Sequence, residues 1–124
     1  MITYSVNATV TRSSRYNRTE FRTLGMNSGD AEKEFAASVD LTTDPLPTFP
    51  ILINTPNISR IKFLGIQVTG GTALIRLSQS EQVYNNIDLP IEGTLLLSGC
   101  DLSQVVVLGT PSGQCFIEVF GMGV

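Results

Sequence analysis

The sequence predicts an all-β fold, an antiparallel β-sandwich or a small jelly-roll-like barrel of about seven or eight strands. Three observations predict it. Apolar and polar residues alternate with period two in several segments, turn residues recur at intervals of roughly 8–12 residues, and no stretch keeps a helical period. With 124 residues the chain has the size of one domain, 1–124, and is long enough to bury its own core.

Alternation defines the first strand, where five apolar residues share one face from Ile2 to Val10. A tight hairpin is expected where residues 60–68 and 72–78 flank Gly70 and Gly71, because paired glycines supply the positive φ of such turns. The chemistry of Thr110-Pro111-Ser112-Gly113 predicts a type I turn. The expected strands are 2–11, 34–42, 51–53, 60–68, 72–78, 94–98, 104–109 and 114–120.

Three segments are expected to be irregular or weakly paired. Residues 25–34 contain Gly, Asn and Ser and are interpreted as a loop, and residues 44–50 hold three prolines that exclude a central strand. Residues 79–93 form the longest polar stretch, and loops of that length are usually functional. Gly65 is expected to mark a β-bulge.

Composition narrows the classes of function. The net charge is −3, which argues against nucleic-acid binding, because a protein that binds phosphates needs a basic face. The chain has no histidine, which removes the commonest general base and the Ser-His and Cys-His pairings, so no enzyme, cofactor or metal is expected. Charged residues make up only 15%, and a polar but weakly charged surface suits contacts with other proteins.

Arginines gather in one segment. Residues 12–22 carry a net charge of +3, because only Glu20 opposes four arginines, and the remainder of the chain carries −6. One interpretation is a solvated connection after the first strand. The other is a docking arm within residues 12–34, in which guanidinium groups bind carboxylates of a partner or a neighbouring subunit. The candidate partner-binding residues are Arg12, Arg15, Arg18 and Arg22.

The cysteines and the hydropathy pattern add expectations about the cell compartment. Cys100 and Cys115 are too few for a disulfide framework or a four-thiolate zinc site, and both are expected to be free and buried. A disulfide between them requires neighbouring strands. No secretory signal and no apolar stretch of membrane-spanning length is recognised, so synthesis in the cytoplasm and no membrane contact are expected.

The long polar stretch offers an alternative function. Carbohydrate-binding modules stack sugar rings on exposed aromatic side chains, and Tyr84 lies in this stretch between Gln82 and Asn86. A carbohydrate-binding or adhesive β-sandwich with a ligand site at these three residues is therefore the alternative to a protein-binding role.

The last third of the chain contains Leu97-Ser98-Gly99, then a strand with Val105, Val106 and Val107, then a turn with Pro111 and Gly113. This succession resembles the closing hairpin of small all-β virion proteins of tailed bacteriophages. The resemblance implies a non-enzymatic structural protein, such as a capsid cement or decoration protein or a head or tail component. It implies that the chain binds capsid or tail subunits and stabilises the virion, which would be made in the host cytoplasm. A homo-oligomer or a bound partner is expected separately, because the charged fraction is low and apolar strands such as 94–98 and 105–109 must be covered on both faces.

Overall fold

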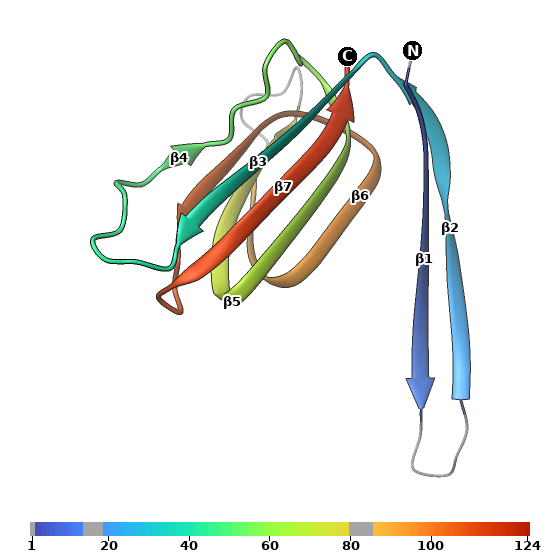
Figure 1. Ribbon diagram of the computed structural model, residues 1–124. Helices are drawn as coiled ribbons and strands as arrows, with labels where there is room; N and C mark the ends of the chain where they lie inside the picture. Colours follow the sequence, from blue (N-terminus) through green and yellow to red (C-terminus); the bar gives the residue numbers. More distant parts are fainter. Residues whose placement is uncertain (1, 14–18, 80–85) are drawn as a thin grey trace.

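The structure is a computed structural model that describes residues 2–13, 19–79 and 86–124, with side chains from Ala31 onward (Figure 1). Its described residues form strands and no helix, so the all-β prediction is confirmed. The strands are β1 (Ile2–Ser13), β2 (Thr19–Ala31), β3 (Lys33–Leu41), β4 (Ile51–Leu52), β5 (Ile61–Gln79), β6 (Asn86–Gly109) and β7 (Cys115–Gly123).

Strands β1 and β2 pair only with each other and form a two-stranded antiparallel ribbon, which we call the arm. Its register runs from Ile2 opposite Ala31 to Ser13 opposite Thr19. The arm extends away from the rest of the molecule (Figure 1). The expected loop at residues 25–34 is therefore wrong, because the alternating strand at the start of the chain takes its backbone partners from this segment.

The remaining strands form one five-stranded half-barrel in the order β3-β7-β5-β6-β4. Strands β5 and β6 bend back on themselves together (Figure 1). Phe63–Val68 pair with Ser98–Gly93, and Ala73–Ser78 pair with Ile91–Asn86, so partner numbers fall as β5 advances and both stretches run antiparallel. Gly70 and Gly93 have φ of 86° and 92° at the bend, a conformation that glycine adopts without a steric penalty.

The expected hairpin of residues 60–68 and 72–78 is wrong. Residues 63–68 lie between β7 and residues 93–98, and residues 74–78 lie between residues 86–90 and 104–109. Both edges of each arm of β5 are occupied by other strands, so the two arms do not pair with each other. Glycine-rich turn chemistry is common to a hairpin and to a bend that carries a strand across the core, and the sequence does not distinguish them.

The connections fall partly as expected. The type I turn is confirmed by a hydrogen bond of 3.0 Å from the Gly113 amide to the Thr110 carbonyl. It joins β6 to β7, which are not neighbours in the sheet, so no closing hairpin is formed there. Residues 86–93 belong to β6, so the expected loop at 79–93 is wrong for this part. The proline-rich segment is irregular as predicted, and Leu46 and Phe49 pack against the core.

The core lies on the concave side of the half-barrel. Alternate residues of both arms of β5 enter it, and Leu64, Ile66 and Ile75 have no exposed surface. A smaller cluster on the outer face joins Ala31 and Phe63, with Leu96 and Met122 packed against it. The arm thus joins the sheet at Ala31, on the outer face. The other core residues are Phe35, Leu41, Ile53, Ile58, Ile61, Val68, Ala73, Leu77, Ile91, Leu102, Val105, Val107, Cys115, Ile117 and Val119.

Gly65 does not mark the expected β-bulge; a glycine stands there because the Phe120 ring lies close to the backbone. In the ladder between β5 and β7 the register shifts between Ile61 and Phe63, and it is regular from Phe63 onward. The ring of Phe120 occupies the space that a Cβ of Gly65 would need. Gly121 is similarly constrained, because a Cβ there would lie 2.6 Å from the Phe35 ring and 2.6 Å from the Phe63 carbonyl oxygen.

Replacing Gly121 by alanine is expected to destabilise the protein by about 1–3 kcal/mol, because the added methyl group overpacks a buried site. Gly109→Ala is the matched control, since a Cβ there meets nothing within 4 Å. That change should be neutral to slightly stabilising. Urea unfolding of both variants measures the difference in free energy, and equal stabilities would contradict the packing described at Gly121.

Candidate functional site

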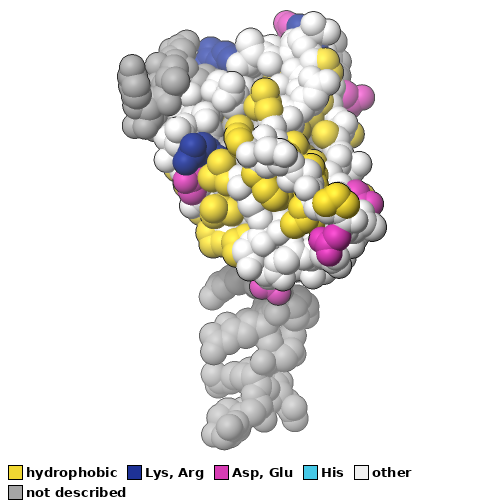
Figure 2. Space-filling model, turned by 90° about the vertical axis from the view of Figure 1, so that its left-hand side faces the viewer, with side chains coloured by type: hydrophobic (Ala, Val, Ile, Leu, Met, Phe, Trp, Pro, Cys, Tyr) yellow, Lys and Arg dark blue, Asp and Glu magenta, His cyan; other side chains and the backbone are white. Residues whose placement is uncertain are grey.

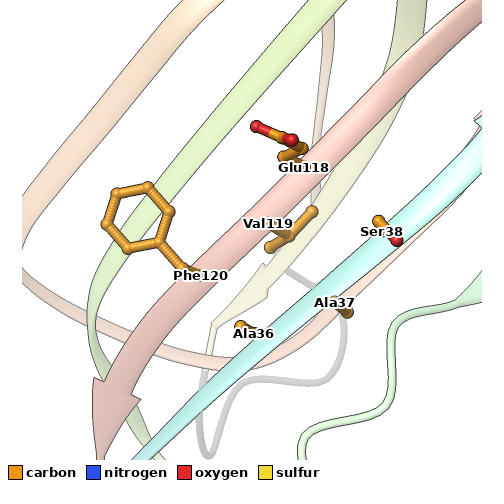
Figure 3. A pocket seen from close by; sticks show the side chains of 6 residues that line it. All are labelled: Ala36, Ala37, Ser38, Glu118, Val119 and Phe120. Atoms are coloured by element: carbon orange, nitrogen blue, oxygen red, sulfur yellow. The ribbon is translucent and has the colours of Figure 1, made fainter.

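The outer face of β3 and β7 carries a shallow hollow. Its volume is about 400 Å³. Cross-strand pairs shape it, because Ala36 lies opposite Phe120 and Ser38 lies opposite Glu118. A small residue therefore faces a large one in each pair, which leaves open space beside the larger side chain. The six lining residues, shown in Figure 3, are Ala36, Ala37, Ser38, Glu118, Val119 and Phe120.

Phe120 is a fixed and exposed aromatic side chain. It retains 45% of its accessible surface, a high value for a phenylalanine on a sheet. Its ring lies over Gly65, its register partner on β5, and its centroid is 5.8 Å from that of Phe63 at an interplanar angle of 47°. Since tilted aromatic pairs of this kind attract each other, the ring has a defined position before any partner arrives.

The hollow continues towards the base of the arm. A second depression of about 460 Å³ shares Ala36 and Phe120 with the first. It also has Glu34 and Met122 in its lining, and Met122 belongs to the outer-face cluster around Phe63. We call the two depressions together the Phe120 hollow. Glu34 and Glu118, one in each depression, give it carboxylates along its length.

The cations of the described sheet region are engaged. The guanidinium of Arg76 binds Asp88 through two hydrogen bonds of 2.7 and 2.9 Å, and this hydrogen bonding lowers the pKa of the Asp88 carboxyl group. Arg60 and Lys62 form ion pairs with Asp101.

Carboxylates are therefore in surplus on this part of the molecule. Lys33 donates to the Asn57 carbonyl at 2.6 Å, so it too has an acceptor. Among the described side chains, no ion pair involves Glu34 or Glu118. The same holds for four further carboxylates, Glu32, Asp40, Asp44 and Glu92.

A second apolar surface lies on the side that carries β4 and the connection from β3 to β4. Figure 2 shows apolar side chains gathered there, with acidic side chains around their margin. Leu52 of β4 is 59% exposed. Strand β4 is one edge of the sheet, and β3 is the other. Its environment differs from the Phe120 hollow because Leu52 is in a strand of only two residues, which pairs with β6 alone.

The structure separates the residues that the sequence singled out. Arg12 is in β1 opposite Glu20, and Arg22 is in β2 opposite Val10, so both belong to the arm. Arg15 and Arg18 lie outside the described residues, as do Gln82 and Tyr84. Asn86 is exposed at the start of β6 opposite Ser78.

Sequence reasoning missed the Phe120 hollow. Alternation did place Phe116, Glu118 and Phe120 on one face of the last strand, which was a signal for an exposed aromatic ring. The register that sets Ala36 and Gly65 beside Phe120 joins three strands far apart in the sequence, so no local pattern contained it.

Comparisons with known proteins give no relative: no protein-family model, no curated protein and no solved structure matches the chain. The described residues contain no helix that is long and apolar enough to cross a membrane. They also contain no group of three or more acidic, Cys or His residues placed to hold a metal ion.

Both cysteines are free, as expected. Cys115 is 1% exposed and Cys100 is half-buried, and burial raises the pKa of both thiols. A higher pKa lowers the fraction of reactive thiolate at neutral pH. We expect slow labelling by a maleimide in the native state, with Cys115 slower than Cys100, and fast labelling of both in denaturant. Fast native labelling of Cys115 would contradict its burial.

Proposed function

We propose that the protein is a non-enzymatic structural subunit that binds other protein subunits and stabilises an assembled particle. The observation that carries this proposal is the arm. Strand β1 pairs only with β2, and the ribbon extends away from the sheet (Figure 1). The alternation of the sequence gives this ribbon one apolar face, and a two-stranded ribbon gains stability when such a face is buried.

The charge distribution supports the same proposal. The arm segment 12–22 carries +3 and the remainder carries −6. The cations of the described sheet region already have acceptors, so its surplus carboxylates are available to cations of a neighbour. Complementary charge steers association and selects the partner more than it adds affinity.

We further propose that the particle is a virion, made in a host cytoplasm, and that the partners are capsid or tail subunits. This part rests on the succession of residues in the chain's last third, which resembles that of small virion proteins of tailed bacteriophages, although β6 and β7 do not pair as the closing hairpin of such proteins. The bent half-barrel is also compatible with a sandwich or jelly-roll architecture, since two arms of β5 and two stretches of β6 face the same core.

The test compares arginines with nearby carboxylates. Particles from the native source are purified, and the amount of the chain bound to them is measured by quantitative mass spectrometry. At about 0.1 M salt we expect Arg15→Ala with Arg18→Ala to lower incorporation at least tenfold, because desolvated charged hydrogen bonds contribute on the order of 1–3 kcal/mol each. The double variant Asp30→Ala with Glu32→Ala is the comparison, and it should lower incorporation much less than the arginine variant does.

Two results would count against the proposal. Absence of the chain from purified particles would reject the structural role. Equal incorporation of the arginine variant and the parent, at both low and high salt, would show that residues 12–22 are a solvated connection.

A further inference from the structure

We propose that the Phe120 hollow is the receiving site for the arm, and that the arm it receives belongs to a second copy of this chain. This inference rests on the proposed function, because it names the surface and the partner through which the subunit associates. Three observations support it: the shape of the hollow, its carboxylates, and the apolar face that the sequence and the strand register give the arm.

The hollow has the shape of an anchor site. A half-exposed ring fixed over Gly65 stands beside Ala36 and Ser38, whose small side chains leave room for an apolar group of a partner. Figure 3 shows the ring to one side of these small residues. Preformed pockets with an aromatic wall are where binding energy concentrates in protein interfaces. A preformed site also limits the entropy lost on binding.

The arm supplies a matching surface. Val6 and Met26 are register partners, and so are Ala8 and Leu24. Register partners share one face of an antiparallel ribbon, so the sequence gives the arm one apolar face. Beyond its base, the arm has no strand of its own chain beside it (Figure 1). The apolar residues that the sequence places on one face of the arm therefore match the exposed ring of Phe120 in character.

Charge complementarity sets the direction of docking. In the sequence residues 12–22 carry +3, and two of their arginines, Arg12 and Arg22, lie in the far parts of β1 and β2. The hollow carries Glu34 and Glu118 without ion pairs to described side chains. Arginine also stacks favourably on an aromatic face, which the Phe120 ring presents. An arm that reaches a neighbour's hollow would place its arginines among these carboxylates.

A second copy is the partner that fits, because one chain carries both halves of the contact. The arm leaves its own sheet at Ala31 and extends away from it, so the far parts of β1 and β2, which carry Arg12 and Arg22, are remote from its own hollow (Figure 1). Contacts of arm to hollow between copies are head-to-tail. Repetition of such a contact closes into a ring when the rotation allows it, and otherwise extends into a filament.

The test is a charge exchange between two variants of the full-length chain. Arm variant Arg12→Glu with Arg22→Glu reverses the charge of the arm, and receiver variant Glu34→Lys with Glu118→Lys reverses the hollow. Association is measured by sedimentation velocity at micromolar concentration in about 0.1 M salt, where charges interact over about 10 Å. The parent should associate, and each variant alone should associate at least tenfold more weakly.

An equimolar mixture of the two variants should regain the parent's association, since each then offers the charge that the other requires. A single chain with all four substitutions should also self-associate. The control replaces the receiver variant by Asp44→Lys with Glu92→Lys, which has the same net charge but leaves the hollow unchanged. Its mixture with the arm variant should not regain association. Circular dichroism verifies that every variant is folded.

A second pair of variants tests the apolar part. Phe120→Ser should weaken self-association, whereas Leu52→Ser, at an even more exposed apolar residue, should not.

A monomeric parent, a mixture of variants that does not associate, or equal effects of Phe120→Ser and Leu52→Ser would overturn the inference. A monomeric parent that still enters particles through its arginines would leave the proposed function intact. Self-association with the expected charge exchange, but no presence in particles, would reject the function and leave the inference.

Discussion

The ladder between β5 and β6 holds both halves of the sheet around one core. Each strand bends in the same region, and the pairing continues on either side of the bend, from Phe63–Val68 to Ala73–Ser78. Buried residues before and after the bend, such as Ile66 and Ile75, therefore reach the same cluster. Each such side chain contributes roughly 1.5–3 kcal/mol when it is removed from water, so the bend allows both arms of β5 to stabilise the same core.

The same bend determines where the functional surfaces lie. Because β5 lies between β7 and β6, its outward residues Phe63 and Gly65 support the ring of Phe120 from below. The ring is in turn opposite Ala36 on β3, the strand that continues directly from the arm. The arm, the hollow and the core are thus connected through three neighbouring strands, β3, β7 and β5. A substitution that displaces the backbone of β5 would therefore alter the position of all three.

Much of the fold was predictable from period-two patterns, because alternation directly reflects one buried and one exposed face. It located the strands around residues 2–11, 34–42 and 114–120 within a few residues. Pairing was less predictable. The positive φ of Gly70 suits a hairpin turn and a bend equally well, and only the positions of β7 and β6 decide between them. Residues 25–31 contain loop-type residues but form a strand, because β1 needs a partner.

Of the two surfaces in the candidate site, only the arm was predictable, because its arginines are close together in the sequence. Four arginines within one short segment are visible in the sequence, and two of them, Arg12 and Arg22, are found on the arm. The Phe120 hollow depends on residues 36, 65 and 120 being aligned across three strands. Such alignment follows from register, which a single sequence without relatives does not specify.

The junction between the arm and the sheet has a mechanical consequence. Only Glu32 separates β2 from β3, and its amide donates to the Gly123 carbonyl at 3.0 Å, beside the pairing of Lys33 with Gly123. A flexible linker would let a tethered element search freely and would isolate the sheet from any pull on it. This junction instead transmits displacement, so tension on the arm would be carried directly into the ladder between β3 and β7. Strand β3 anchors the arm and also forms one wall of the Phe120 hollow. A pull on the arm would therefore displace that wall, and a partner bound in the hollow would displace the base of the arm.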